Sequence, residues 1–272
     1  AEACVAVELE TGATLSASLV VGADGRASPS RAAAGITCRT WGYPQTAIVT
    51  SFSHSRAHDG ISTELHRSAG PFTTVPLPDG RSSLVWVERP EEARRLAGLD
   101  DAVLIDAIET RLMGLLGSVS RLGPRATYPL SSAIAEPLAA RRIALVGEAG
   151  HIFPPIGAQG LNLGLRDVAH LASLVAGAVG RGEDPGSPAV LERYIEARRG
   201  DVAMRTYAVD ALNRTLIAGA LPLDVLRGAG IAALSAIGPL RDRIVEAGLG
   251  WQADLPDLMR EGPPSPSVAT LR

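Results

Sequence analysis

The stretch "RIALVGEAGHIFPPIGAQGLNLGLRDVAHLA", residues 142–172, joins a short apolar segment to a loop rich in proline and glycine and then to an apolar helix. Residues 141–147 have the continuous apolar pattern of a strand buried in a parallel sheet. Such a strand delivers Glu148 to the carboxyl edge of the sheet, where α/β folds bind their ligands. The stretch therefore predicts a ligand-facing loop between a parallel strand and a helix.

The loop itself is suited to lie flat against a ligand. Pro154 and Pro155 favour an extended backbone, and Gly157 and Gly160 leave backbone amides without side chains beside them. Residues 161–162 then begin a helix, whose N-terminus carries a partial positive charge. These features indicate a planar, electron-rich or anionic group as the ligand.

A second turn follows the same pattern. Residues 19–31, "LVVGADGRASPSR", end a strand in Gly-Ala-Asp-Gly, which places Asp24 and the flexible Gly25 at a sheet edge. The residues alone leave two readings of Asp24 open. It accepts hydrogen bonds from a ligand, or it caps the following helix, which is worth about 1 kcal/mol, and the residues slightly favour the cap.

The bulk composition narrows the class of protein. The 272 residues are 46% hydrophobic and carry a net charge of -3, which predicts a globular chain without the basic face that nucleic acid requires. Two cysteines, Cys4 and Cys38, are too few for a disulfide framework or a repeated zinc motif. We therefore expect a cytoplasmic location and two buried thiols.

The patterning around the two turns predicts an antiparallel sheet and long helices. Alternation predicts strands over residues 3–9, 14–22, 45–53, 61–67, 72–77 and 82–88, the last two joined by a turn at 78–80. Residues 100–116 predict a helix with Asp100 as its N-cap, and its apolar face is Val103, Leu104, Ala107, Ile108, Leu112 and Leu115. Another helix is predicted from Pro188 to about Leu216, with further helix starts at 222 and 239.

Two groups of basic side chains are assigned no chemistry. His54, His58 and His66 lie in strands and loops without convergent geometry, so no metal site is predicted. The helix that starts at 188 is predicted to carry a solvated face of four arginines, with contact to an anionic membrane surface as the alternative. These are Arg193, Arg198, Arg199 and Arg205. His151, close to Glu148 and Asp167 in the sequence, leaves general-base chemistry open as a function.

The two turns together resemble a known family. "LVVGADGRASPSR" is similar to the Asp-Gly motif, and residues 142–172 to the Gly-Asp motif, of the FAD-dependent aromatic hydroxylases, and within these to the ubiquinone-biosynthesis hydroxylases. "WGYPQTAIV" (41–49), "GPFTTVPLPDGRSSLVW" (70–86) and "YPL" (128–130) resemble that subgroup in order and spacing. The resemblance extends to about residue 250.

This resemblance implies a flavin monooxygenase that hydroxylates a phenolic, polyprenylated ring, with FAD as cofactor, NAD(P)H as reductant and O2 as oxidant. It implies that Asp24, with Gly25, Arg26 and Arg31 nearby, lies by the pyrophosphate, and that Glu148 meets the ribityl chain. The residues implied to line the isoalloxazine ring are Pro155, Gly157, Gln159, Gly160, Leu161 and Asn162. The resemblance also favours a loop-orienting role for His151 over general-base chemistry. No acid or base is predicted for the phenol, so no catalytic residue is named.

The implied fold class is α/β, or mixed α+β. A partial Rossmann-like FAD-binding domain (1–38 and 136–182) is interleaved with an antiparallel-sheet domain that covers the substrate (39–135). C-terminal helices (183–261) and a disordered tail (262–272) follow. The apolar helices leave open a peripheral contact with the inner membrane surface, and no oligomeric state is predicted.

Two features depart from the family pattern. The family begins with a βαβ unit carrying G-x-G-x-x-G, whereas this sequence begins at Ala1 within a strand pattern, and its Gly228 and Gly230 stand in a helical context. We therefore expect an N-terminally truncated chain that binds FAD weakly or not at all. The second departure is Glu148, where the family has Asp; the added methylene moves the acceptor by roughly 1.5 Å.

Two alternative functions remain. A related flavoenzyme such as a halogenase or a reductase is disfavoured because the W-x-W-x-I-P signature of halogenases is missing. A non-catalytic scaffold or assembly partner, of the same fold but without its nucleotide-binding unit, belongs to a different functional class.

Overall fold

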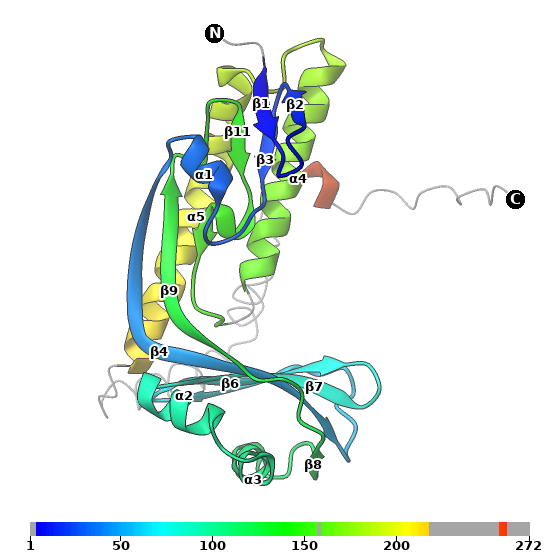
Figure 1. Cartoon of the computed structure of the whole chain (residues 1–272), viewed down its shortest axis with the longest axis vertical. Helices are drawn as coiled ribbons and strands as arrows, with labels where there is room; N and C mark the ends of the chain where they lie inside the picture. The colour runs from blue at the N-terminus through cyan, green and yellow to red at the C-terminus, as the bar shows by residue number, and fades with distance from the viewer. Residues whose placement is uncertain (1–3, 157–158, 218–255, 260–272) are drawn as a thin grey trace, which may run out of the picture.

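The computed structural model describes residues 4–156, 159–217 and 256–259, and they form two sheet regions joined by two long strands (Figure 1). In the smaller region, β1 (Val5–Glu8) and β2 (Thr14–Ala17) form a hairpin, and β3 (Val20–Gly22) lies beside β11 (Ile143–Leu145), which also pairs with β10 (Ala139–Ala140). β3 and β11 run parallel, which confirms the parallel strand predicted within residues 141–147. The predicted mixed α/β fold class is confirmed.

The larger region, called the wide sheet below, is an antiparallel sheet of seven strands in the order β12-β9-β4-β7-β6-β5, with β8 paired to β4. Its strands are β4 (Thr37–His54), β5 (Thr63–Arg67), β6 (Gly70–Leu77), β7 (Arg81–Glu88), β8 (Val119–Ser120), β9 (Ala126–Glu136) and β12 (His151–Ile152). Because β4 and β9 pair along most of their lengths, they form a ribbon that connects the two regions (Figure 1).

Helices cover both regions. They are α1 (Pro29–Ala33), α2 (Pro90–Ala97), α3 (Asp101–Leu112), α4 (Gln159–Gly180) and α5 (Pro188–Ile217), with short 3-10 turns η1 (Gly147–Ala149) and η2 (Asp257–Met259). α2 and α3 bury one face of the wide sheet, where Phe72 and Trp86 pack with Leu104 and Ile108. α4 and α5 pack against each other and bury a second core around Leu145.

Most predicted strands are present, with two corrections. Residues 14–22 were expected to form one strand, but they divide into β2 and β3 because the first half pairs with β1 and the second half with β11. β4 starts at Thr37, well before the predicted 45–53, since its N-terminal half pairs with β9. The turn at 78–80 joins β6 to β7 as predicted, with Asp79 and Gly80 both at positive φ (62° and 65°).

The helix predictions are also partly corrected. α5 runs from Pro188 to Ile217 as predicted, whereas α2 was missed. α3 ends at Leu112, so Leu115 lies outside it, and Val103 is 50% exposed because only the positions in register with Leu104 face the sheet. Asp100 is the N-cap residue but makes no capping bond with its side chain. The prediction of two buried thiols is wrong, since Cys4 is exposed and Cys38 half-buried.

Among the described helices, α4 has the length and apolar composition to cross a membrane, a property that core helices share. Its Arg166 and Asp167 are buried, and both pair with groups on α5. One side of α4 is exposed and apolar at Leu161, Leu165 and Val168. The ion pairs that Arg166 and Asp167 form with α5 are typical of a helix packed within a folded domain.

The predicted domain boundaries stay predictions. The helices expected after 217, the tail at 262–272 and the pair Gly228 and Gly230 lie outside the described residues. The peripheral membrane contact, which was assigned to those helices, stays a prediction as well.

The α3–sheet contact gives a test of this core. Replacing the fully buried Ile108 by Ala should lower the free energy of unfolding by about 2–5 kcal/mol, because it removes buried methyl groups and leaves a cavity. Val103→Ala, on the exposed side of the same helix, should change it by less than about 0.5 kcal/mol. Urea denaturation of both variants measures the difference, and equal losses would contradict the observed orientation of α3.

Candidate functional site

The parallel pairing of β3 and β11 brings the two motif turns to one sheet edge. Gly22 lies opposite Leu145, and the Val146 N–H donates to the Gly22 carbonyl at 3.0 Å. Arg31 of α1 then fastens one turn to the other. Its guanidinium donates to the Ala149 carbonyl and to the Arg26 carbonyl, each at 2.8 Å. The two turns that resemble the Asp-Gly and Gly-Asp motifs therefore lie together at one edge of this sheet.

Asp24 organises its own turn. Its carboxylate accepts from the Ser28 hydroxyl at 2.5 Å and from the Ser30 N–H at 2.8 Å. Ser28 is the N-cap of α1, since its hydroxyl accepts from the Arg31 N–H. Burial acts to raise the pKa of Asp24, but the bonds from Ser28 and Ser30 outweigh it and lower that pKa. The reading of Asp24 as the N-cap, which the sequence slightly favoured, is therefore wrong: Ser28 is the N-cap, and Asp24 supports the start of α1 through Ser28 and Ser30 while it remains exposed at the sheet edge.

Gly25 and Arg26 complete this turn. Gly25 has φ 74°, a conformation that favours glycine. A Cβ built on it would meet no atom within 4 Å, so the turn is open on that side. Arg26 is exposed and donates to the Ser131 hydroxyl of β9 at 2.7 Å. Arg26 therefore ties the first turn to the ribbon of β4 and β9.

Glu148 sits on η1, directly after β11, and its side chain is exposed. Within the described part of the chain, its carboxylate has neither a hydrogen bond nor an ion pair. The preceding Gly147 has φ 59°, so the chain reverses sharply at the end of the strand. Glu148 is thus an acidic side chain at the sheet edge with its full capacity to accept hydrogen bonds.

The start of α4 lies beside η1. A Cβ on Gly164 would come within 3.3 Å of the Gly147 Cα, so the absence of a side chain lets the helix approach the turn closely. One turn earlier, Gly160, Leu161 and Asn162 are exposed, and Leu161 is 74% exposed. Pro155 is exposed on the preceding loop. Gly157 lies outside the described residues.

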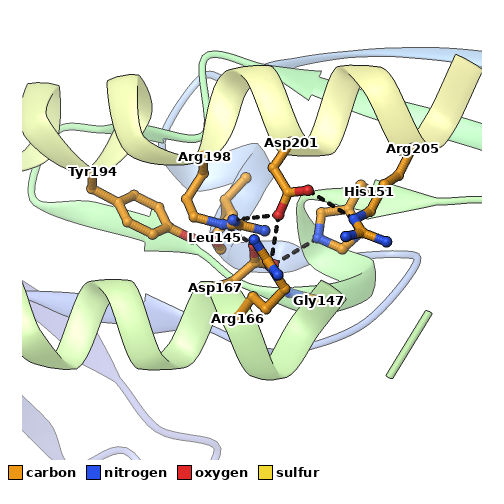
Figure 2. A network of polar contacts seen from close by, with 9 residues as sticks. All are labelled: Leu145, Gly147, His151, Arg166, Asp167, Tyr194, Arg198, Asp201 and Arg205. Carbon is orange, nitrogen blue, oxygen red and sulfur yellow. Dashed lines mark hydrogen bonds and ion pairs between the residues drawn. The ribbon is translucent and has the colours of Figure 1, made fainter. Parts of the chain in front are cut away.

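A buried network of ion pairs holds η1, α4 and α5 together (Figure 2). At its centre the Asp167 carboxylate accepts from the Gly147 N–H at 3.0 Å and from Arg198 Nε at 2.8 Å, and it lies 2.6 Å from His151 Nε2. All three side chains are at most 3% exposed. Asp167 therefore fixes the backbone immediately before Glu148.

Asp201 on α5 forms the second centre of this network. Its carboxylate accepts from Arg166, Arg198 and Arg205 at 2.7–2.8 Å. Burial acts to raise the pKa of Asp201, but these guanidinium bonds outweigh it and lower the pKa. Arg205 also donates to the Gln159 side-chain oxygen at 2.8 Å, so the network reaches the first residue of α4.

A buried hydrogen bond outside this network fastens α5 to β11. The Tyr194 hydroxyl donates to the Leu145 carbonyl at 2.6 Å, close to the strand end that carries the second turn. Burial raises the pKa of Tyr194 well above its usual value. The phenol therefore stays a hydrogen-bond donor throughout the neutral range.

The network corrects one prediction and supports another. Arg198 and Arg205 were expected on a solvated face, but both are buried, whereas Arg193 and Arg199 are exposed as expected. The signal that could have revealed this is the spacing of Arg198, Asp201 and Arg205, which places alternating charges on one face of a helix. His151 lies 2.6 Å from Asp167 of α4, so it links the segment after η1 to that helix, in agreement with the loop-orienting role.

The histidines at 54, 58 and 66 have structural partners. His54 contacts the Arg56 carbonyl and the Ser82 hydroxyl, and His58 contacts the Leu77 carbonyl. His66 lies 3.0 Å from Glu64. Over the described ranges, no group of His, Cys, Asp and Glu has the geometry of a metal site.

The amino-acid sequence is similar to that of flavoproteins. A family model described as "FAD binding domain" matches residues 2–209. The ubiquinone hydroxylase UbiL of Rhodospirillum rubrum is 42% identical over 246 residues, 90% of this chain and 57% of the relative. The ubiquinone biosynthesis monooxygenase COQ6 of Homo sapiens is 30% identical over 275 residues, 89% of this chain and 59% of the relative. The chain spans little more than half the length of these relatives.

Two solved structures share the fold. The p-nitrophenol 4-monooxygenase PnpA of Pseudomonas putida superimposes with a TM-score of 0.70 at 21% identity, over 90% of this chain and 63% of that chain. The Diels-Alderase PyrE3 superimposes with a TM-score of 0.70 at 22% identity, over 94% of this chain and 55% of that chain. At these identities the likeness shows the fold alone.

The Asp167 network can be tested by removing its central carboxylate. Asp167→Ala should lower the free energy of unfolding by about 3–5 kcal/mol, because it leaves the Arg198 guanidinium buried and without one of its counter-charges. Glu92→Ala removes the partner of an exposed arginine, Arg95, and should have little effect. Thermal or urea unfolding compares the two, and a small loss in Asp167→Ala would show that the buried network does not hold the turn.

Proposed function

Because the chain belongs to the FAD-binding domain family, we propose that it supplies the ring and ribityl part of a flavin site in a monooxygenase. The substrate class is a phenolic ring of a ubiquinone precursor, and the reductant is NAD(P)H. The balanced reaction consumes one O2, one NAD(P)H and one proton, places one oxygen atom on the ring and releases the other as water. The names of UbiL and COQ6 support this class of substrate.

The residues present fit the flavin. Glu148 offers a free carboxylate for the hydroxyls of a ribityl chain. The first turn of α4 presents backbone N–H groups and the positive end of a helix dipole to an electron-rich ring. Gly160 has no atom within 4 Å of a built Cβ, so a flat group can approach its backbone. This donor and acceptor set suits FAD better than a metal or a nucleic acid.

The chain's own residues would bind and orient the cofactor. Glu148 would hold the ribityl chain, and Pro155, Gln159 and the exposed backbone of residues 160–162 would lie along the isoalloxazine ring. Asp24, Gly25 and Arg26 would border the pyrophosphate. When bound, reduced FAD supplies the activation of O2, while the protein orients the reactants and excludes water. No described side chain is assigned as the acid or base for the phenol.

The face of the wide sheet opposite α2 and α3 is suited to an aromatic substrate. The pairing register places Val49, Val75, Val85 and Tyr128 on that face, together with the buried Ala47. Val75 is 40% and Tyr128 is 55% exposed. An apolar face of this kind would bind the ring and an adjoining prenyl chain by burying apolar surface.

One observation carries the proposal: the parallel pairing of β3 with β11 gathers the exposed Glu148, the open Gly25 turn and, next to them, the start of α4. These residues lie far apart in the sequence. Their meeting at the carboxyl edge of a parallel pair is the arrangement in which α/β folds bind dinucleotides.

The role of Glu148 can be measured through flavin binding. We expect Glu148→Ala to weaken the binding of FAD about tenfold, which corresponds to the loss of one hydrogen bond to a charged acceptor. Glu91→Ala removes an exposed carboxylate on α2, on the far side of the wide sheet, and should leave FAD affinity unchanged. Quenching of flavin fluorescence measures both. An unchanged FAD affinity in Glu148→Ala would contradict the role proposed for Glu148.

The reaction itself can be tested with isotopically labelled O2. The product of the complete gene, supplied with FAD, NADPH and a polyprenylated phenol, should form a hydroxylated ring that carries one labelled oxygen. Mass spectrometry identifies the product, and absorbance follows the oxidation of NADPH. An unlabelled hydroxyl group, or no product although FAD is bound, would overturn the proposed function and favour a scaffold.

A further inference from the structure

The ribbon of β4 and β9 turns a corner at an irregularity in β4. Gly42 lies opposite Ser131 and Thr46 lies opposite Pro129, so Tyr43, Pro44 and Gln45 together face the single residue Leu130. β4 acquires β7 as its second neighbour only from Thr46 onward. The bulge therefore lies where the ribbon widens into the wide sheet, and the C-terminal end of α5 lies beside this corner (Figure 1).

Asp210 of α5 binds the β4 side of this corner. One of its carboxylate oxygens accepts from the Tyr43 hydroxyl at 2.5 Å and from Trp41 Nε1 at 2.8 Å. The Ser132 hydroxyl of β9 lies 2.7 Å from the Tyr43 oxygen, so both strands of the ribbon join the contact. The other carboxylate oxygen accepts from Arg214 at 2.9 Å.

The protonation states of this contact are complementary. Burial, together with the bond to Asp210, raises the pKa of Tyr43 to about 12. Burial acts to raise the pKa of Asp210, but the bonds from Arg214, Tyr43 and Trp41 outweigh it and lower the pKa. At neutral pH the phenol is a donor and the carboxylate an acceptor, which makes charge-assisted bonds of the stronger kind.

Asn213 makes a second contact one turn further along α5. Its side-chain nitrogen donates to the Gln45 side-chain oxygen at 2.9 Å, and the Gln45 nitrogen donates to the Ala69 carbonyl just before β6. Asn213 is fully buried and Gln45 is 2% exposed. A Cβ on the neighbouring Gly70 would overlap Val87 and reach Gln45, so the packing leaves this contact little freedom.

α5 is also fastened to η1, the turn that carries Glu148. Arg198 binds Asp167, which holds the Gly147 N–H, and Asn213 binds the corner of β4. Between Arg198 and Asn213 the helix is continuous and spans roughly 22 Å at the usual rise per residue. A single rigid element therefore connects η1 to the wide sheet.

From this geometry we propose that Asp210 and Asn213 are positioning residues, which fix the angle of the wide sheet relative to the turn that carries Glu148. The apolar face of the sheet is thereby held at a set distance from the flavin site. This consequence for substrate binding rests on the proposed function. The mechanical part of the proposal, that Asp210 and Asn213 fix the corner of the sheet, rests only on the observed hydrogen bonds.

Hydrogen–deuterium exchange of the intact chain tests the mechanical part. Asp210→Ala should raise amide exchange about tenfold or more in residues 39–48 and 130–135, because the corner loses its charge-assisted bonds. Exchange in residues 143–152 should not change. Asp210→Asn and Tyr43→Phe, which preserve the packing, should give smaller increases in the same segments. Glu196→Ala, an exposed carboxylate on the same helix, is the matched control and should change neither region.

An equal rise in all segments for Asp210→Ala, or no rise beyond that of the control, would overturn the proposal, since the contacts would then contribute only general stability or nothing. The emission of Trp41, obtained by subtracting the spectrum of Trp41→Phe, gives a second readout. It should shift in Asp210→Asn, because the indole loses a negatively charged partner.

A kinetic arm separates this proposal from the proposed function. In the product of the complete gene, Asp210→Asn should raise KM for the phenol several-fold and leave FAD affinity within about twofold. An unchanged KM would overturn the consequence for substrate binding. Absence of hydroxylation in the unsubstituted protein would count against the proposed function, while the exchange results would still decide the mechanical part.

Discussion

The buried carboxylate of Asp167 is the interaction on which the site depends. A buried anion is costly unless it is fully paired, and Asp167 is paired with a guanidinium, a histidine and a backbone N–H at the same time. These partners come from α5, from β12 and from η1. Because all three partners bind the same carboxylate, Asp167 holds α5, β12 and η1 in fixed positions relative to one another. η1 is the element that carries Glu148.

The rest of the architecture follows from how the two regions are joined. β3 and β11 are short, and each alone would be a weak strand, but their parallel pairing buries apolar side chains beneath α4 and α5. The wide sheet has a core of its own under α2 and α3, while its strand β9 also contributes Ile134 and Ala135 to the core around Leu145. Among the described residues, the contacts that link the two regions come from the ribbon of β4 and β9, from the short β12 and from α5.

The sequence predicted what is local and missed what depends on tertiary contacts. The two motif turns, the parallel strand before Glu148 and the start of α5 carry local signals, namely apolar runs, glycines and a proline, and all three are correct. The burial of Arg198 and Arg205 could not be read from composition, because a helix face rich in arginine normally points to solvent. Asp201, on the same helix, and Asp167, on α4, reverse this by pairing with the two guanidinium groups, and the pairing with Asp167 is a contact between helices that the sequence does not reveal. The exposure of Val103 has the same explanation, because the position of the sheet determines which face of α3 is buried.

The two acidic residues that the motifs supply behave differently, and this bears on the departure at Glu148. The Asp24 carboxylate accepts hydrogen bonds from Ser28 and Ser30, so it stabilises the turn before α1. Glu148 has no such duty within the described residues, and its backbone is held by Asp167 on one side and by Arg31 on the other. A rigid backbone cannot retreat to compensate for the added methylene. The carboxylate therefore extends roughly one C–C bond, about 1.5 Å, further from the sheet edge than an aspartate would. A ribityl chain bound as proposed would therefore lie that much further out, unless the side chain folds back through a different rotamer.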